Sequence, residues 1–233
     1  NYLPGYSTMK EKERVVFFLR DGLSAAEKER MTAYGADMSK YLDSGNEARI
    51  KKAYESRDPR LQMAVITPYA QYNGASSGIA HTYTLRWPYR GSDSAEPFDI
   101  RTDTNDKFYY LWRKFVPEGL EQTERDTYGL DIPLIRYAEV LLLKAEALNE
   151  WGSTHESEAI RCVNEVRRRA GHVELNNATY PATKVNGQSD LRERIRNEYY
   201  WEIGGEDSMY FHELRWGTWK DKKFDNNRNG LMQ

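Results

Sequence analysis

Hydrophobic residues recur at helical spacing most regularly between Asp131 and Gly171. The first part of this stretch carries one apolar stripe, formed by Leu134, Ile135, Ala138, Leu141, Leu142, Ala145 and Leu148. Asp131 is a good N-cap, and Pro133 falls in the first turn, where a missing N–H costs little. The pattern predicts a helix that begins near Asp131 and ends at Trp151 and Gly152.

A second helix follows after a short turn. Ser153 and Glu156 have the spacing of a capping box, although Thr154 or Ser157 can serve as the cap instead. One face of this helix is apolar and consists of Ala159, Ile160, Val163, Val166 and Ala170, with Gly171 suited to the C′ position. So short a connection requires the two helices to pack antiparallel. One pair buries too little surface alone, so we expect further helices to stack on it as a scaffold.

The N-terminal third also predicts helices. A short apolar run at 14–19 fits either a buried strand or the start of a helix. The capping box of Ser24 and Glu27 predicts a helix that continues to about Asp43, and another helix is expected from about 47 to 56. Pro59 then disfavours helical geometry at the residue before it and predicts a turn.

Two more helices are expected after the central pair. A polar loop at 173–188 precedes a helix capped by Ser189 or Asp190. Its apolar face consists of Leu191, Ile195, Tyr199 and Ile203, and two glycines end it. A short final helix is expected over about 207–216.

The segment from Leu61 to Leu130 has a different character. Its first part, Leu61–Thr67, is apolar and predicts an extended conformation. Turn-forming residues then separate a series of aromatic residues: Tyr69, Tyr72, Tyr83, Trp87, Tyr89, Phe98, Tyr109, Tyr110 and Trp112. A long, weakly periodic stretch in a folded chain is usually functional or disordered, and the aromatic content argues against disorder. We therefore expect an ordered, loop-rich insertion.

Composition narrows the class of protein. The 233 residues are 39% hydrophobic and 30% charged, which is typical of a soluble globular chain, and the net charge of −2 argues against a broad nucleic-acid footprint. The sequence contains no apolar run long enough to span a bilayer and no signal-peptide pattern, and it begins without Met, so we expect a mature or truncated chain. Cys162 is the only cysteine and fits a small core residue. The 17 Tyr and 6 Trp residues exceed what a core needs and suit a recognition surface.

Several motifs, in this order along the chain, resemble the SusD/RagB family of outer-membrane nutrient-binding lipoproteins. They are Arg57–Leu61 (RDPRL), Ile132–Leu143 (IPLIRYAEVLLL) with Ala145–Ala147, Asn164–Gly171 (NEVRRRAG), Ile195–Glu198, Glu202 with Ile203, and Leu214–Gly217 (LRWG). The resemblance covers about residues 58–217 and is looser in the middle segment.

The chain departs from the family pattern near its end. The family's glutamate–glycine–x–arginine step is Glu206–Met209 here, without the arginine. His212 stands near the place where an aspartate is common. We therefore expect the family's buried arginine–carboxylate contact to be absent there. The early helices, the lipid-carrying N-terminal cysteine and the closing segment of the family are also missing, so the sequence resembles the later part of a longer protein.

The resemblance implies a mainly α fold in which tetratricopeptide-like helix pairs form an α-α superhelix with a long loop-rich insertion and minor β structure. The chain is then one SusD-like region with helices at 1–60, the aromatic insertion at 61–130, the helix pair at 131–171, and further helices and a tail at 172–233. It also implies a lipid-anchored protein on the outer face of the outer membrane. Such a protein covers a SusC-like TonB-dependent transporter and passes ligand to it.

The charged residues of the motifs are interpreted as structural rather than catalytic. Arg136 and Glu139 are three residues apart and can pair on one helix. The arginines at 167–169 lie in the last turn of a helix, where a solvated, dipole-complementing role is favoured. Glu198 and Glu202 lie one turn apart on what is expected to be an exposed helix. Glycosidases need two carboxyl groups that face each other across a cleft, so this pair does not indicate hydrolysis.

Metal and cofactor sites are not indicated. The four histidines, His81, His155, His172 and His212, lack metal-ligand spacing, and the sequence contains no phosphate-binding or dinucleotide-binding glycine motif. The segment 103–106 (DTND) offers clustered oxygens for a calcium ion but lacks EF-hand spacing, so a solvated acidic loop is favoured. We expect no cofactor.

The aromatic insertion supplies the candidate binding residues. Sugar rings stack their C–H faces on Trp and Tyr, while their hydroxyl groups bond to polar side chains. Trp87, Tyr89 and Arg90 form the first candidate cluster, and Tyr72 with Asn73 forms the second. The alternative is that these rings fix a long loop to the scaffold.

The sequence thus predicts non-catalytic binding of oligosaccharides and their delivery to a SusC-like transporter for nutrient uptake. Two alternatives remain open: a peptide-binding member of the same family, and a helix-pair module that docks another protein. A glycoside hydrolase is disfavoured.

Overall fold

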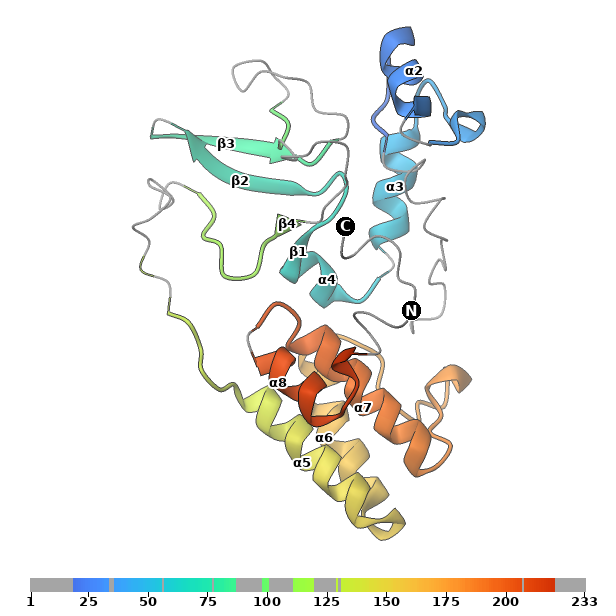
Figure 1. Cartoon of the computed structure of the whole chain (residues 1–233), viewed down its shortest axis with the longest axis vertical. Helices are drawn as coiled ribbons and strands as arrows, with labels where there is room; N and C mark the ends of the chain where they lie inside the picture. Colours follow the sequence, from blue (N-terminus) through green and yellow to red (C-terminus); the bar gives the residue numbers. More distant parts are fainter. Residues whose placement is uncertain are drawn as a thin grey trace. The chain divides into compact units, whose positions relative to one another are not determined.

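The computed structural model describes residues 19–33, 36–55, 57–76, 78–86, 98–100, 111–119, 129, 131–206 and 208–220. The chain divides into two compact units, Asn1–Pro133 and Leu134–Gln233 (Figure 1). Among the described residues helices dominate and the strands form two small sheets, so the predicted mainly α fold with minor β structure is confirmed. Each unit has its own hydrophobic core.

The second unit is built on the predicted helix pair, α5 (Tyr137–Trp151) and α6 (Glu156–Arg169). Lys144 of α5 contacts Glu158 of α6, and Tyr137, which lies earlier in α5, contacts Glu165, which lies later in α6. The two helices are therefore antiparallel. Helix α7 (Gln188–Glu202) packs on both, and α8 (Ser208–Arg215) follows it (Figure 1). The short 3₁₀ turns Ser153–His155 and Pro181–Thr183 lie in the connections.

The predicted apolar faces form the core of this unit. Its buried residues include Ala138, Leu141, Leu142, Ala145, Ala159, Ile160, Cys162, Val163, Val166, Leu191, Ile195, Tyr199 and Ile203. Cys162 is buried, as expected for a packing residue, and burial raises the pKa of its thiol above the ordinary value. Gly171 has φ 69° just beyond the α6 cap, so the predicted C′ position is confirmed.

The predicted start of α5 is wrong. The N-cap is Arg136, which has extended backbone angles (φ −110°, ψ 148°), rather than Asp131. Leu134 and Ile135 therefore precede the helix and are exposed, at 89% and 73%, instead of joining the apolar stripe. The proline at 133 disfavours helical geometry before it, and the side chain of Arg136 binds carboxylates on α7 and beyond it.

The turn between α5 and α6 also differs from the prediction. Gly152 adopts φ 135°, and the main chain then forms a 3₁₀ turn that leads directly into α6. The residue before α6 is His155, whose side chain makes no capping hydrogen bond. The capping box of Ser153 and Glu156 is thus replaced by main-chain turns that start at a glycine.

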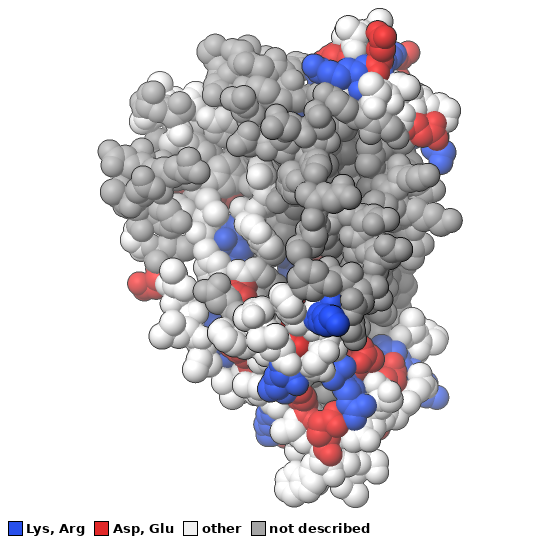
Figure 2. Space-filling view, in the orientation of Figure 1, with Lys and Arg blue, Asp and Glu red and all other residues white. Residues whose placement is uncertain are grey.

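Charged residues of both signs lie on the surface of the second unit. Figure 2 shows basic and acidic side chains interspersed over its helices. Several of them form ion pairs, such as Lys144 with Glu158 and Arg192 with Glu150. Exposed pairs of this kind contribute little to stability, but they keep the surface polar.

Arg167 at the end of α6 and Glu198 and Glu202 of α7 are buried, contrary to the sequence prediction. Arg168 and Arg169 are exposed, as the prediction of a solvated helix end requires. Arg167 is buried, and its Nε donates to Glu198 Oε2 at 2.8 Å. Arg167 also donates to the main-chain oxygen of Val173 at 2.9 Å. Glu198 has an exposed fraction of 0%. Because α6 packs beside α7, both charged groups lie inside the helical unit. There each needs the other to compensate for the hydration that it loses on burial.

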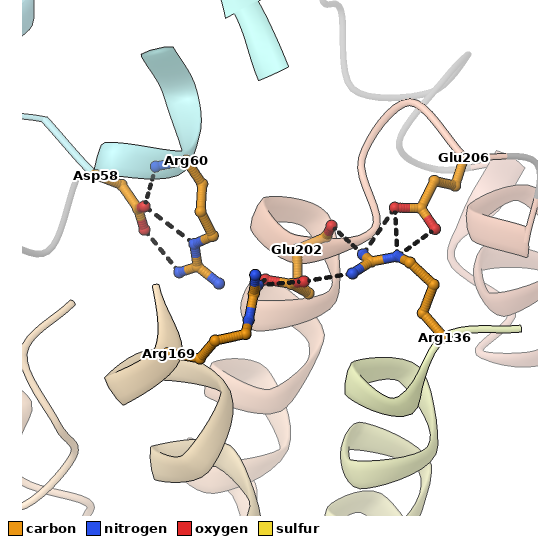
Figure 3. A network of polar contacts seen from close by, with 6 residues as sticks. All are labelled: Asp58, Arg60, Arg136, Arg169, Glu202 and Glu206. Atoms are coloured by element: carbon orange, nitrogen blue, oxygen red, sulfur yellow. Dashed lines mark hydrogen bonds and ion pairs between the residues drawn. The ribbon is translucent and has the colours of Figure 1, made fainter. Parts of the chain in front are cut away.

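A second group of ion pairs lies around Glu202 (Figure 3). Arg136 donates to Glu202 Oε1 at 2.8 Å and to Glu206 Oε1 at 2.7 Å, while Arg169 donates to both oxygens of Glu202 at 2.6 Å. Hydrogen bonds to the two carboxylates raise the pKa of Arg136, although burial alone would lower it. The predicted pair of Arg136 with Glu139 is wrong, because the guanidinium of Arg136 binds Glu202 and Glu206, which are distant in the sequence.

Glu139 instead binds His212 on α8. His212 Nε2 lies 2.8 Å from Glu139 Oε1, and both side chains are buried. The other ring nitrogen, Nδ1, lies 3.2 Å from a guanidinium nitrogen of Arg215, which can only donate. Nδ1 therefore accepts and Nε2–H donates to the carboxylate. This contact stands in the region where the sequence led us to expect a lost arginine–carboxylate contact, and Met209 joins the core beside it.

The first unit begins with short helices: α2 (Ala25–Ala33), the 3₁₀ turn Met38–Lys40, and α3 (Asn46–Glu55). The capping box is confirmed, because Ser24 N–H donates to Glu27 at 2.8 Å and Glu27 N–H donates to Ser24 Oγ at 3.3 Å. Helix α2 ends ten residues before the predicted end near Asp43, and the Asp37 side chain caps a separate turn. The apolar run at 14–19 lies outside the described residues except for Leu19, which is buried.

Helix α4 (Pro59–Ala64) occupies most of the segment that was predicted to be extended. Asp58 is its N-cap and accepts from the main-chain N–H of Arg60 at 2.9 Å. The same carboxylate binds the Arg60 guanidinium at 3.0 and 2.7 Å (Figure 3). A capping aspartate followed by proline at N1 starts a helix, and this signal prevails over the apolar run.

The strands complete the first unit. β1 (Val65–Ile66) pairs antiparallel with β4 (Leu111–Trp112), and β2 (Gln71–Ser76) pairs antiparallel with β3 (Ile79–Thr84). The sheets pack on a core that contains Leu19, Leu23, Met31, Ala36, Ile66 and Leu85. The two-stranded β2–β3 hairpin is thereby fixed at its base, while its far end is exposed.

The buried pair of Arg167 and Glu198 generates a test of the helical unit. Glu198→Ala leaves a buried guanidinium without its carboxylate, so we expect the free energy of unfolding to fall by about 3–5 kcal/mol. Urea denaturation followed by circular dichroism measures this change. Arg167→Met combined with Glu198→Leu should recover most of the loss, and the surface variant Glu158→Ala is the matched control. A loss in Glu198→Ala no larger than in Glu158→Ala would contradict a stabilising role for the pair.

Candidate binding site

The β2–β3 hairpin carries the two predicted site residues that the structure describes, Tyr72 and Asn73. Its register pairs Tyr72 with Tyr83, Asn73 with Thr82, and Gly74 with His81. Successive residues of a strand point to opposite faces of a sheet. The side chains of Tyr72 and Asn73 therefore lie on opposite faces of the hairpin.

One face of the hairpin is aromatic. It carries Tyr72, His81 and Tyr83, and Phe98 packs against it with ring centroids 4.4 Å from His81 and 5.8 Å from Tyr83. Gly74 lies between the tyrosines, and a Cβ there would come within 2.9 Å of Tyr83 Cε2. Only a glycine leaves room for this ring. The described rings of this face are half-buried, so they form a packed aromatic layer with exposed edges.

The other face is polar and exposed. It carries Gln71, Asn73 and Thr82, all of them exposed. The Thr82 hydroxyl donates to Asn73 Oδ1 at 3.2 Å, which orients the amide across the two strands. Within the described residues, no acceptor meets the amide nitrogen of Asn73. This face thus offers a fixed amide donor beside a second amide and a hydroxyl.

The segment 116–119 lies along the outer edge of β2. Gly119 N–H donates to the Asn73 carbonyl at 2.6 Å, and the Asn73 N–H donates to Glu118 Oε2 at 3.2 Å. The Tyr72 hydroxyl donates to the Pro117 carbonyl at 3.0 Å. Arg113 pairs with Glu118 at 3.3 Å and also donates to the Gln71 carbonyl. These contacts cover a strand edge that would otherwise expose its main-chain groups.

The turn before β2 positions the hairpin. Tyr69 adopts φ 62°, in the left-handed region that side chains other than glycine rarely occupy. Its N–H donates to the Leu85 carbonyl at 3.0 Å, and Leu85 N–H donates back to Ala70 at 3.3 Å. The ring is buried, and burial raises the pKa of its hydroxyl far above the ordinary range, so Tyr69 stays neutral. Burial of this ring compensates for the unfavourable backbone angle.

A buried ion pair fixes the chain after β3. Arg86 donates to Asp99 at 2.5 Å and to Glu47 of α3 at 3.3 Å. The bonds to Asp99 and Glu47 raise the pKa of Arg86 against the opposing effect of burial. Thr84 N–H also donates to Phe98 O at 3.0 Å. The aromatic ring of Phe98 is therefore held beside the hairpin by main-chain and charged contacts.

The structure brings together only part of the predicted site. Tyr72 and Asn73 belong to one hairpin but to different faces, so one sugar ring cannot stack on the first while it bonds to the second. Trp87, Tyr89 and Arg90 lie outside the described residues. The assignment of all five as binding residues stays a prediction.

Residues that the sequence reasoning missed complete the two faces. Gln71 and Thr82 extend the polar face, and His81 with Tyr83 extends the aromatic one. The sequence does indicate these two faces, because polar and aromatic residues alternate in QYNG and again in HTYT with the period of a strand. Trp112, another aromatic residue of this segment, lies in β4 and is 54% exposed.

Neither a metal-binding cluster nor a membrane-spanning helix occurs among the described residues. They contain no group of three or more His, Cys, Asp or Glu side chains placed to hold a metal ion. The calcium candidate at 103–106 lies outside them. None of the helices in these ranges has the length and apolar character needed to cross a bilayer.

Comparisons with known proteins agree with the sequence motifs. The sequence model of the SusD family matches residues 16–233. SusD-like protein P38 of Formosa agariphila is 36% identical over 104 residues, which are 44% of this chain and 20% of that relative. The matched part of the chain spans about a fifth of the length of that curated relative.

The contact of Tyr72 with the 116–119 segment gives a test of the site's architecture. Tyr72→Phe removes the hydrogen bond to Pro117, which is worth about 1 kcal/mol, so the Gly119 amide should exchange about fivefold faster. Hydrogen exchange followed by NMR measures this rate. Tyr210→Phe, which changes an exposed tyrosine of α8, should leave it unchanged. An unaltered Gly119 rate in Tyr72→Phe would mean that this bond does not hold the segment.

Proposed function

The chain belongs to the SusD family, and from this membership we propose that it binds oligosaccharides without chemical turnover and passes them to a SusC-like TonB-dependent transporter. The ligand is bound in the first unit, on the β2–β3 hairpin and the aromatic segment that follows it. The helices of the second unit act as the scaffold.

The observation that carries this proposal is the composition of the hairpin's two faces. Sugars combine apolar C–H faces with hydroxyl groups, so they need aromatic surface and oriented hydrogen-bonding groups close together. The hairpin offers exposed edges of Tyr72 and Tyr83 on one face and the polar groups of Gln71, Asn73 and Thr82 on the other. An oligosaccharide of several units, bound over the hairpin's edge, contacts both faces.

The absence of catalysis is supported by the state of the family's motif carboxylates. Glu198 is paired with Arg167, Glu202 with Arg136 and Arg169, and Glu139 with His212. A glycosidase needs one carboxyl group that holds a proton and a second that faces it across a cleft. Carboxylates that are buried in ion pairs are poorly suited to either role.

The proposed location is the outer face of the outer membrane, with a lipid anchor on an N-terminal cysteine outside this chain. Cys162 is not that residue, because it is buried in α6. The transporter partner requires a protein-contact surface, and the second unit has exposed apolar side chains suited to it. They include Val140 and Leu143 on α5 and Phe211 and Leu214 on α8.

A peptide ligand is the second candidate, and the outer edge of β3 favours it. Thr84 exchanges main-chain hydrogen bonds with Phe98 and Ile100 on that edge, so by alternation the main-chain groups of Thr82 and Ala80 point the same way. In the described chain nothing bonds to these groups. An extended peptide can pair with such an edge by strand addition.

Calorimetry with a panel of oligosaccharides and a panel of peptides tests the proposal. Asn73→Ala removes one oriented amide, so the dissociation constant of the bound sugar should rise about three- to tenfold. Trp87→Ala removes a candidate stacking platform and should also weaken binding. Asn186→Ala, which removes an exposed amide from the second unit, is the matched control and should bind as the unaltered chain does.

Each outcome bears on a different part of the proposal. Unchanged affinity in both Asn73→Ala and Trp87→Ala would remove the site assignment. Cleavage of the sugar during the titration would contradict non-catalytic binding. Binding of peptides in the absence of any sugar binding would favour the second candidate.

A further inference from the structure

An exposed aromatic stack lies at the tip of the helical unit. Trp151 is the last residue of α5, and His155 closes the following 3₁₀ turn. Their rings are stacked, with centroids 4.4 Å apart and an angle of 26° between the planes. Although His155 covers one side of the indole, Trp151 remains 75% exposed. One face of the indole is therefore open.

Packing within the unit does not account for this ring. The buried residues near the end of α5 are Leu142, Ala145 and Asn149, which lie on the side of the helix that faces α6 and α7. Trp151 is on the outer side. An indole left in water forgoes the stabilisation that burial of a large apolar side chain contributes.

The platform is held rigidly. Gly152, at φ 135°, turns the chain sharply, and His155 N–H donates to the Gly152 carbonyl at 3.0 Å. The helix end beneath it is tied to α7, because Arg192 binds both oxygens of Glu150 at 2.6 and 2.7 Å. Gln188 donates to the Asn149 carbonyl at 2.7 Å. A ring fixed in this way loses little freedom when a ligand covers it.

We propose that Trp151, backed by His155, is a second carbohydrate-contacting platform, on which one sugar ring of a bound oligosaccharide stacks. The ligand class rests on the proposed function, but the site is separate from the hairpin. The turn between the rings carries Ser153 and Thr154, both exposed, which supply hydroxyl groups beside the platform. The residues that dominate binding in a protein–protein interface are surrounded by contacts that exclude water. Trp151 instead stands alone among polar turn residues, which argues against a protein partner.

The test uses NMR of the tryptophan indole N–H groups in the full chain. The signal of Trp151 is identified by its absence in Trp151→Phe, and the chain is titrated with the oligosaccharide that binds most tightly in calorimetry. We expect the Trp151 signal to shift in a saturable manner. The shift should persist in the double variant Asn73→Ala, Trp87→Ala, which weakens the hairpin site alone.

Controls separate this inference from the proposed function. Trp151→Ala should abolish the second binding event and leave the hairpin's affinity unchanged, whereas Tyr210→Ala, at an exposed aromatic residue of the same unit, should alter neither. A Trp151 signal that does not move while the hairpin binds sugar would overturn the platform and leave the proposed function in place. A Trp151 shift without hairpin binding would support the platform and contradict the hairpin assignment.

Discussion

Glu198 and Glu202 of α7 lie inside the helical unit only because arginines from the N-cap of α5 and from α6 pair with them there. Glu198 has no exposed surface and binds Arg167, and Glu202 is held between Arg136 and Arg169. A buried charge is costly unless it is paired and hydrogen-bonded, so these contacts fix how the three helices approach one another. The register of the unit follows from them. Helix α8 is added by the same means, through the buried contact of His212 with Glu139.

These ion pairs explain why the most regular part of the chain is poorly suited to catalysis. The acidic residues that resemble a catalytic pair in sequence are committed to structural ion pairs. The irregular first unit has the opposite character, since its hairpin exposes amides and a hydroxyl on one face and ring edges on the other. Many proteins carry their binding residues on loops that a rigid scaffold positions.

Local patterns in the sequence predicted the helical core well and the polar contacts poorly. The spacing of Leu191, Ile195 and Tyr199 identified a buried face because burial of apolar residues follows helical period. The partners of Arg136 are 66 and 70 residues away, and no local pattern could have indicated them. Arg167 was expected in solvent because its position on α6 is at the helix end, yet tertiary packing covers it. The hairpin was missed because its period-2 alternation is short and lies within turn-forming residues.

We propose that ligand binds to the β2–β3 hairpin of this SusD-family chain without chemical turnover. Hydrogen–deuterium exchange, with and without saturating oligosaccharide, tests it most directly, because the outward amides of Ala80 and Thr82 in β3 bond to nothing in the described chain and exchange until a ligand covers them. We expect slower exchange over Gln71–Thr84 and recovery of the sugar unchanged. Binding of the sugar with no change in exchange over Gln71–Thr84 would contradict it.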